Sequence, residues 1–316
     1  MPWFLELGLA MTVLELLNRS ADHLKNHRIE NPRLNAELLL AFSLKVSREG
    51  LYIRVKDEVP EEGQEAFERL IEARIAGEPL QYLLGHQEFW SIDFRVDSRV
   101  LIPRPETELL VEQALVILSE MSREKTPSAV EIGTGSGAVA ISLAKEVPNL
   151  LVVATDISGD ALWVARENAR SAEVLSQIQF VMGDLFAPFH LSGERGLFDL
   201  ILSNPPYVEH SEVERLPKEI RDYEPIVALD GGAEGLEIGR SIVQQAPFYL
   251  RKGGWLLLEV GQGQGEKVAE QIERSGFFWG PQLLPDLSGI GRVVKAQRKE
   301  RNSKHEIRNT KEVRMI

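Results

Sequence analysis

Residues 204–207, Asn-Pro-Pro-Tyr, are the part of this chain whose residue types could most directly do chemistry. They follow an apolar run at 198–202, and two consecutive prolines cannot continue a strand. The Asn204 side chain and the Pro205 backbone each offer a carbonyl oxygen, which the fixed φ angles of Pro205 and Pro206 hold in place. Two such acceptors on a planar NH2 group would orient it and turn its delocalised lone pair outward, while the Tyr207 ring offers a flat face. The stretch therefore predicts a site that activates a planar NH2 group by positioning, without a general base.

A glycine loop precedes this turn in the sequence EIGTGSGAVAISLA, residues 131–144, which has the pattern strand, loop, helix. Gly133, Gly135 and Gly137, with Thr134 and Ser136 between them, permit a tight turn and a close approach of the backbone to a ligand. Asp156 ends the next apolar run, about 20 residues further on, which is the spacing of a carboxylate that binds ribose hydroxyls. The loop therefore predicts a site for an adenosyl ligand.

The acids at the strand ends favour one class of ligand. The glycine spacing also satisfies the looser G-x-G-x-x-A pattern of dinucleotide sites. Glu131, beside the loop, would repel a pyrophosphate but could attract the ammonium group of a methionyl tail. Asp184, after the third predicted strand, could accept from an adenine amino group, with Leu185 against the ring. These carboxylates favour S-adenosylmethionine over a dinucleotide.

The elements that must position these residues form an alternating β and α pattern from residue 127 onward. The apolar runs are nearly continuous, which is typical of parallel strands covered on both faces and indicates a doubly wound α/β domain of Rossmann-like type. Ligands in such sheets bind beyond the carboxyl ends of the strands, so the glycine loop and the 204–207 turn should share one rim. The expected strands are residues 129–132, 151–155, 178–182, 198–202, 255–260 and 292–296.

The rest of the chain has a different character. Residues 1–85 show helical apolar spacing and predict a small helical bundle, with Asn31 as an N-cap before Pro32. Residues 86–102 alternate apolar and polar side chains, which predicts a β-hairpin connector. The α/β domain is then expected over 103–297, and the basic segment 298–316 is expected to be a flexible tail.

Composition narrows the function classes. The chain has 316 residues, 43% of them hydrophobic and 27% charged, as in a soluble globular protein. It has no cysteine, which excludes disulfides, thiolate nucleophiles and Cys-ligated zinc and fits a cytoplasmic location. No basic segment precedes the first apolar stretch and no apolar run is long enough to cross a bilayer, so neither a signal peptide nor a membrane span is expected.

Charge and histidine placement argue against two other kinds of partner. The net charge of −12 disfavours a broad electrostatic grip on nucleic acid. His23 and His27 lie at helical i, i+4 spacing, but with no third ligand nearby the pair favours a solvated helix face, and no metal site is predicted.

These residues resemble those of a known family, the class I adenosylmethionine-dependent methyltransferases that act on planar NH2 groups. Within it the chain is most similar to the release-factor glutamine methyltransferases (HemK/PrmC). The resemblance runs from about residue 30 to 297. Its most specific carrier is the block GEPLQYLLG–EFW–LIPRPETE, since Asn-Pro-Pro-Tyr also occurs in adenine-N6 methyltransferases. The other carriers are NPRLNAELLLAFSL, ATDIS, GDLF, FDLILSNPPYV, YEPIVAL and GGWLLLEVGQGQ.

The resemblance implies S-adenosylmethionine-dependent methylation of the glutamine side-chain amide in the Gly-Gly-Gln tip of bacterial class-1 peptide-chain release factors. It implies cofactor contacts from residues 133–137, Asp156 and Leu185. It also implies that Asn204 faces both cofactor and substrate, and that residues 205–207 hold the glutamine. Glu131 stands where many relatives have Asp, so the carboxylate is kept on a longer side chain.

Three alternatives remain at this point. An adenine-N6 methyltransferase acting on DNA or RNA would share the chemistry but would need a basic target-recognition surface. An NAD-type oxidoreductase would need a proton-handling residue near the nicotinamide, and no partnered His or Tyr is in view. A non-catalytic protein-binding module would leave the glycine loop, the acids and the 204–207 turn without a purpose.

Overall fold

The computed structural model describes residues 11–121, 126–191 and 196–300. The chain forms two units, each described here by itself. The first runs to His86 and also includes Pro217–Tyr223, and the second consists of Gln87–Leu216 with the residues from Glu224 onward. No helix within the described ranges has the length and apolar character needed to cross a membrane.

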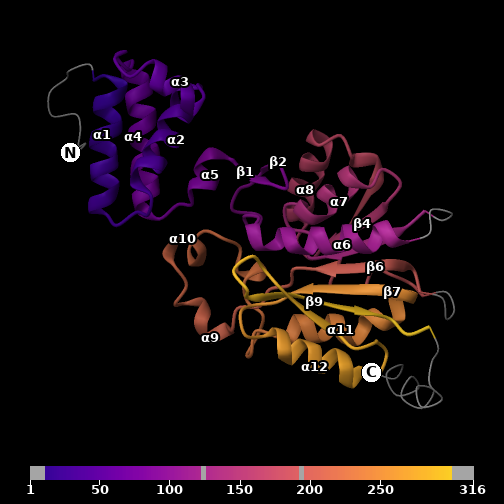
Figure 1. Ribbon diagram of the computed structural model, residues 1–316. Helices are drawn as coiled ribbons and strands as arrows, with labels where there is room; N and C mark the ends of the chain where they lie inside the picture. The colour runs from indigo at the N-terminus through magenta and orange to yellow at the C-terminus, as the bar shows by residue number, and fades with distance from the viewer. Residues whose placement is uncertain (1–10, 122–125, 192–195, 301–316) are drawn as a thin grey trace. The chain divides into compact units, whose positions relative to one another are not determined.

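The first unit is helical, as the apolar spacing predicted. Its buried side chains include Leu16, Leu17, Leu39 and Phe67, which form one hydrophobic core. In Figure 1 the three longest helices of this unit lie side by side. The helices are α1 (Val13–Asn26), α2 (Pro32–Leu44), α3 (Arg48–Ile53), α4 (Glu61–Ala76), α5 (Leu80–Leu84) and α10 (Lys218–Arg221).

The helix ends show which local signals operate. Thr12 and Glu15 form a capping box at the start of α1, and Gly77 ends α4 in the left-handed conformation that favours glycine. Asn31 is the N-cap residue of α2, but its side chain makes no capping hydrogen bond. The expected position is right, whereas the expected capping interaction is absent, because Asn31 is itself left-handed with φ 47°.

A buried arginine ties Pro217–Tyr223 into the helical unit. Arg74 of α4 is 8% exposed and its Nη2 lies 2.7 Å from Oε2 of Glu219. Its Nε donates to Oδ1 of Asn35 in α2 at 2.9 Å, so one guanidinium joins three segments. The pairing spans 145 residues of sequence and could not be expected from local patterns.

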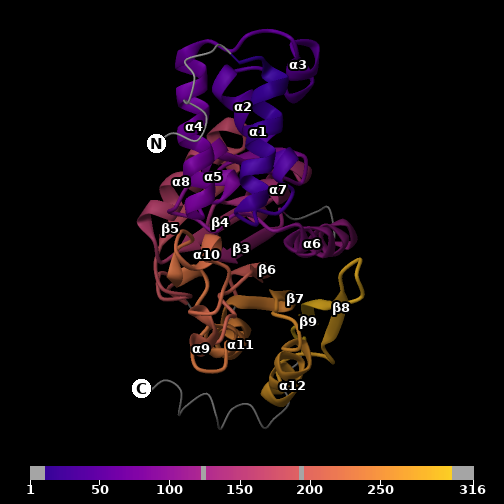
Figure 2. The same cartoon turned by 90° about the vertical axis from the view of Figure 1, so that its left-hand side faces the viewer.

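The second unit is built on a seven-stranded sheet in the order β5-β4-β3-β6-β7-β9-β8, which can be followed across Figure 2. Strands β3 to β7 pair in parallel, whereas β9 pairs antiparallel with both β7 and β8. The order reverses direction between β3 and β6, so this is the topological switch point of the sheet. The strands are β3 (Ser128–Ile132), β4 (Leu151–Asp156), β5 (Ile178–Met182), β6 (Phe198–Ser203), β7 (Leu250–Glu259), β8 (Gln282–Pro285) and β9 (Gly291–Gln297).

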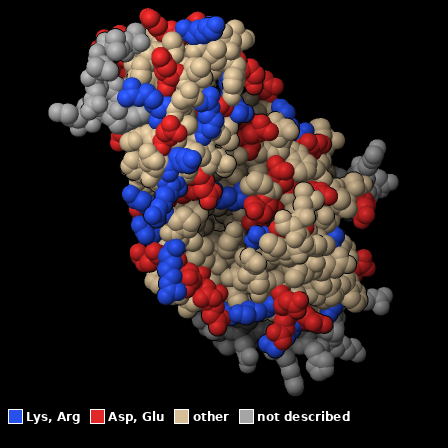
Figure 3. Space-filling model, turned by 60° about the vertical axis from the view of Figure 1, so that its left-hand side comes forward, with Lys and Arg blue, Asp and Glu red and all other residues tan. Residues whose placement is uncertain are grey.

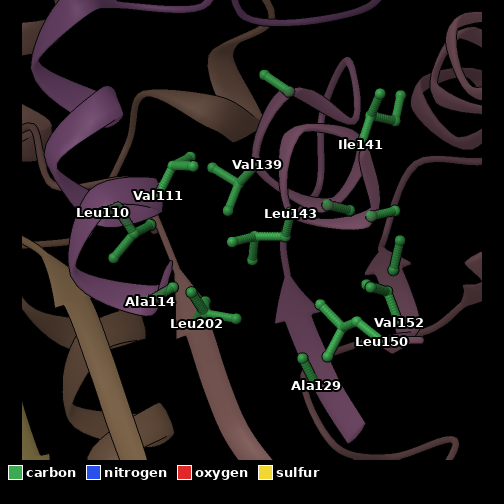
Figure 4. Close-up of a cluster of buried hydrophobic side chains, with 14 of the residues drawn as sticks. Leu110, Val111, Ala114, Ala129, Val139, Ile141, Leu143, Leu150, Val152 and Leu202 are labelled. Atoms are coloured by element: carbon green, nitrogen blue, oxygen red, sulfur yellow. The ribbon is translucent and has the colours of Figure 1, made fainter. Parts of the chain in front are cut away.

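Helices cover both faces of this sheet (Figure 1). On one face, α6 (Glu108–Glu120), α7 (Ala138–Glu146) and α8 (Gly159–Ser171) bury an apolar cluster, part of which is drawn in Figure 4. On the other, α11 (Glu237–Tyr249) and α12 (Gly265–Ser275) bury a second cluster against the sheet. The predicted doubly wound α/β class is therefore confirmed. The short elements are the helix α9 (His210–Val213) and the 3-10 turns η1 (Pro105–Thr107), η2 (Leu175–Gln177) and η3 (Ile226–Ala228).

The expected hairpin is present as β1 (His86–Phe89) and β2 (Ile92–Arg95). Trp90 and Ser91 between them both have positive φ, the geometry of a tight two-residue turn that matches strand twist. Phe89 and Phe94 are buried in the same cluster as α6 and α7, with ring centroids 6.1 Å apart. The hairpin is therefore packed onto the α/β unit.

Two sheet features differ from the sequence analysis. β8 was not expected, and β9 is antiparallel although its apolar run was grouped with parallel strands. Apolar continuity reports burial on both faces and does not encode strand direction. The basic tail falls largely at residues 301–316, outside the described residues.

Candidate active site

A cavity lies at the switch point of the sheet, beyond the carboxyl ends of β3 to β6. Its walls include residues of the predicted glycine loop, the predicted strand-end acids and the 204–207 turn. The expectation that these segments share one rim is met by the sheet order, which places β3 and β6 next to each other. The predicted residues that line it are Glu131, Gly133, Thr134, Gly135, Ser136, Asp156, Asp184, Leu185, Asn204, Pro205 and Pro206.

The three glycines of the loop have two different roles. All have positive φ, at 75° for Gly133, 54° for Gly135 and 85° for Gly137. A methyl group on Gly133 or Gly135 would meet no atom within 4 Å, so at these positions the backbone borders open space. On Gly137 it would lie 2.8 Å from Ile141 and 3.1 Å from Ala165, and Gly137 does not line the cavity. Gly137 therefore serves the packing of α7 against α8.

Asp156 ends β4 and faces the loop. Its Oδ2 accepts from the Gly135 N–H and its Oδ1 from the Ser158 N–H, both at 2.9 Å. Burial raises the pKa of this carboxyl, and the backbone hydrogen bonds act in the opposite direction. Both oxygens are thus fixed by the backbone, and each keeps a lone pair for a further donor, as a ligand for two vicinal hydroxyls requires.

Glu131, at the base of the loop, is 3% exposed. Its Oε2 accepts from the Thr134 hydroxyl at 2.6 Å and from the Ala140 N–H at 3.1 Å, inside the first turn of α7. Burial raises the pKa of this carboxyl to about 8, the two hydrogen bonds oppose the shift, and the charge of Asp156 adds to it. The longer side chain is therefore used to hold the loop to the start of α7 while still bordering the cavity.

Asp184 and Leu185 follow β5 on the far side of the cavity. Leu185 has φ 47°, an uncommon value for a leucine, and this conformation belongs to the turn that brings its side chain to the wall. Asp184 is exposed. An acceptor and an apolar side chain thus both line the cavity here, and their role as an adenine pocket stays a prediction.

Asn204 follows β6 directly. Its Nδ2 donates to Oγ1 of Thr107 at 3.1 Å, and among the described residues nothing donates to its Oδ1. The amide is therefore oriented by its nitrogen, and its carbonyl oxygen remains available at the cavity.

Tyr207 is placed differently from the expectation. It does not line the main cavity but a smaller one beside it, which also includes Glu259 and Gln264. Burial raises the pKa of its phenol to about 12, with the nearby Glu259 charge acting in the same direction. Its backbone carbonyl accepts from Nε2 of Gln264 at 2.9 Å, so the turn is fastened from the start of α12. Pro205 and Pro206 border both cavities.

Three residues at the site were missed by the sequence analysis. Thr107 is 4% exposed and holds the Asn204 amide, and Arg104 lines the cavity and is paired with the buried Glu224. Glu259 ends β7 behind the 204–207 turn. The signal that could have found Glu259 was the same one used for Glu131 and Asp156, an acid at the end of an apolar run.

Surface charge bears on the kind of partner. On the face shown in Figure 3, Lys and Arg side chains are interspersed with Asp and Glu. A nucleic-acid surface would gather basic side chains along one stripe or patch.

Two family models and a solved structure are similar to parts of this chain. Residues 15–85 match the family model described as the PrmC N-terminal domain, and residues 111–220 match the methyltransferase small domain. Human methyltransferase 10 domain containing protein has a TM-score of 0.50 at 14% identity, covering 75% of this chain and 98% of that one, which supports the fold.

Curated relatives match over nearly the whole chain. The release factor glutamine methyltransferase of Geobacter sulfurreducens is 41% identical over 90% of this chain and 95% of its own length. That of Moorella thermoacetica is 40% identical over 92% of this chain and 100% of its own length. At this identity and coverage, the chain belongs to the release factor glutamine methyltransferase family.

Proposed function

We propose that this enzyme transfers a methyl group from S-adenosylmethionine to the side-chain nitrogen of the glutamine in the Gly-Gly-Gln motif of bacterial class-1 release factors. The observation that carries the proposal is the position of Asn204 and Pro205 at the carboxyl end of β6, in one cavity with the glycine loop after β3. The names of the relatives support the same substrate.

The cavity fits S-adenosylmethionine better than a dinucleotide. Its wall carries open backbone at Gly133 and Gly135, and carboxylates at Glu131, Asp156 and Asp184. Arg104 is the one Lys or Arg among the described residues that line it, and Glu224 already neutralises it. A pyrophosphate would meet the Asp156 and Asp184 carboxylates here, whereas an adenosyl group offers donors to these acids and an ammonium tail would favour the ionised form of Glu131.

Each residue then has a defined task. Asp156 would receive the ribose hydroxyls, Asp184 and Leu185 the adenine, and Glu131 would face the ammonium end. The bound cofactor supplies an electrophilic methyl group. The task of the chain is to bring a poor nucleophile into line with it.

Asn204 and Pro205 perform that task on the substrate nitrogen. Oδ1 of Asn204 and the Pro205 carbonyl would each accept one N–H bond of the glutamine amide, leaving the nitrogen lone pair directed away from both acceptors. Such preorganised acceptors also stabilise the positive charge that develops on the nitrogen. The nitrogen then gives up one proton to an acceptor oxygen or to water, which returns the amide to neutrality.

We assign substrate recognition to the helical unit, residues 1–85, because a Gly-Gly-Gln tip is too short to define a protein substrate. The match of residues 15–85 to the PrmC N-terminal domain supports this assignment. The cytoplasmic location expected from the absence of cysteine fits a substrate of the translation apparatus.

The decisive experiment is mass spectrometry of a purified release factor after incubation with enzyme and S-adenosylmethionine. We expect one added methyl group on the peptide that contains Gly-Gly-Gln and none on a release factor with Gly-Gly-Ala. Parallel incubations with DNA and RNA test the adenine-methylating alternative. Methyl groups added to the nucleic acid, and none added to the release factor, would overturn the proposal.

A further inference from the structure

Two segments that carry the resemblance have no task in the proposed function. They are LIPRPETE at 101–108 and the EPIVAL part of YEPIVAL at 224–229. Both contribute to the wall of the main cavity, the first through Arg104 among others and the second through Val227 and Ala228. Two stretches so far apart in the chain that meet at one cavity call for a reason beyond packing.

A buried acid joins the two segments. The Glu224 side chain is 1% exposed and is paired with the guanidinium of Arg104. The other carboxylate oxygen of Glu224, Oε2, accepts from the Ile102 N–H at 3.3 Å. Moving Arg104 away would leave an uncompensated buried charge, which is costly, so Glu224 holds residues 102–104 in a defined place.

The same two segments also reach the Asn-Pro-Pro-Tyr turn. Oγ1 of Thr107 accepts from Nδ2 of Asn204 at 3.1 Å. On the other side, the Leu229 carbonyl accepts from the N–H of Val208, the residue after the turn, at 2.9 Å. Three segments distant in sequence are therefore joined pairwise around the edge of the cavity.

The backbone passes the constraint from the ion pair to Thr107. The Thr107 N–H donates to the Arg104 carbonyl at 3.0 Å, which closes the turn η1. Thr107 is 4% exposed, so its hydroxyl is held inside the protein. Among the described residues this hydroxyl is the one hydrogen-bond partner of the Asn204 side chain. Thr107 alone therefore decides which end of the amide faces η1.

We propose that the Arg104–Glu224 pair positions Thr107, and that the Thr107 hydroxyl selects the orientation of the Asn204 amide in which Oδ1 is presented to the substrate nitrogen. The inference deepens the proposed function and rests on it, because Asn204 is there an acceptor for the substrate NH2 group. Thr107, Arg104 and Glu224 are positioning residues, since they act on the reaction through Asn204.

The two orientations of the Asn204 amide have opposite effects on the substrate. With Nδ2 on Thr107, the oxygen is left for the substrate NH2 group. With the amide flipped, the NH2 group of Asn204 would face the substrate NH2 group, and two donors would oppose each other. One neutral hydrogen bond of ordinary strength favours the productive orientation by roughly tenfold.

The first test measures kcat at saturating cofactor and release factor. Thr107→Val removes the hydroxyl at nearly constant volume and should lower kcat by roughly 10-fold. Thr107→Ser keeps the hydroxyl and should stay within about twofold of the wild type. Glu224→Gln, which leaves Arg104 without its ionic partner, should lower kcat by roughly 3- to 10-fold. Glu270 of α12, paired with Arg274 at an exposed site, gives a matched control, and Glu270→Gln should react at the wild-type rate.

A double variant separates this role from a general loss of structure. If Glu224 acts through the Thr107 hydroxyl, adding Glu224→Gln to Thr107→Val should slow the reaction by no more than about twofold beyond Thr107→Val alone. Losses that multiply would show that the two residues act independently and would overturn the inference. A wild-type kcat in Thr107→Val would do the same.

The second test needs neither substrate nor cofactor. In protein labelled with 15N-asparagine, the Asn204 side-chain NH2 signals are assigned by their loss in Asn204→Ala. They should shift in Thr107→Val and in Glu224→Gln, and stay in place in Thr107→Ser and Glu270→Gln. Asn204 signals that are unchanged in Thr107→Val would overturn the inference. A wild type that does not methylate release factor would instead contradict the proposed function, and the NMR result would still report on the positioning of Asn204.

Discussion

The Gly135 backbone and the Asp156 side chain are joined by a hydrogen bond of 2.9 Å between the backbone nitrogen and Oδ2. Ser158 binds the other oxygen of the same carboxylate, so the loop after β3 and the turn after β4 share one acid. This arrangement makes Asp156 a fastener of the glycine loop, and we propose that the same carboxylate binds the cofactor that the loop receives.

Asp156→Asn should weaken S-adenosylmethionine binding by about 10- to 100-fold, or roughly 1.5–3 kcal/mol. The amide keeps one acceptor but sets its NH2 group against a backbone N–H, and it cannot accept from two ribose hydroxyls. Isothermal titration calorimetry measures the affinity. Asp160→Asn, an exposed acid in the first turn of α8, is the matched control and should bind normally. Equal affinity in Asp156→Asn would disprove the ribose assignment.

The parts of the site that the sequence analysis predicted are those whose signals are local. The glycine loop, Asp156 and the 204–207 turn each lie within a few residues of an apolar strand, and parallel pairing brings strand ends together. Thr107 lies 97 residues before Asn204, and no short pattern links them. Glu259 was taken as part of a core strand and its turn, which is correct for its backbone and misses its side chain.

In the fold, too, the features with local sequence signals were predicted, and those that depend on distant contacts were not. Six strands were expected close to where they occur, because nearly continuous apolar runs mark strands covered on both faces. β8 is four residues long and only partly buried, so it carries little of that signal. The inclusion of Pro217–Tyr223 in the helical unit depends on the Arg74–Glu219 pair, which only the folded chain creates.

Asn204→Ala should lower kcat by about 10²–10³-fold, the usual cost of removing one preorganised group at a developing charge. Cofactor affinity should remain largely intact, because the carboxylates and the loop are unchanged. Single-turnover kinetics with release factor, together with a cofactor titration, separates the two effects. A near-normal rate would rule out the paired-acceptor mechanism.

Glu131 should make stability depend on pH. An acid whose pKa is higher in the folded chain binds more protons there, so the free energy of unfolding falls as pH rises between the two pKa values. For Glu131 this range runs from its ordinary 4.5 to about 8. Glu131→Gln removes this dependence. The free energy of unfolding of the variant, relative to that of the wild type, should therefore rise by a few kcal/mol as pH increases across that range. Denaturant unfolding of both proteins at several pH values measures the difference, and parallel curves would contradict the prediction.

Glu37 should make the stability of the helical unit depend on pH. It is 1% exposed and accepts from Arg33 and Arg48 at 2.7 Å each and from Tyr52 at 2.5 Å. Burial alone would raise the pKa of its carboxyl, but these hydrogen bonds lower it overall. The stabilisation is therefore present above the ordinary pKa and is lost as pH falls through the folded one.

Glu37→Ala should accordingly destabilise the helical unit by roughly 3 kcal/mol at neutral pH, and by less in acid. Thermal unfolding followed by circular dichroism tests this. Glu30→Gln, at an exposed position, serves as the control. A loss that is the same at acidic and neutral pH would show that the carboxylate charge is not the cause.

Gln264 should support catalysis from outside the cavity. Its Nε2 donates to the Tyr207 carbonyl at 2.9 Å, while its Oε1 accepts from the Gly261 N–H at 3.0 Å, so one side chain ties the turn after β6 to the turn after β7. Loss of two neutral hydrogen bonds costs about 1–3 kcal/mol, and the turn that carries Asn204 would then sample more orientations.

Gln264→Ala should lower kcat by roughly 10-fold, because the turn that carries Asn204 is held less firmly. Cofactor affinity should change little, because the glycine loop follows β3 and makes no contact that depends on Gln264. Gln262, two residues earlier and exposed, offers a closely matched control, and Gln262→Ala should keep the wild-type rate. Methylation of release factor under single-turnover conditions distinguishes the two variants. If both variants react equally fast, the 204–207 turn owes its rigidity to its prolines alone.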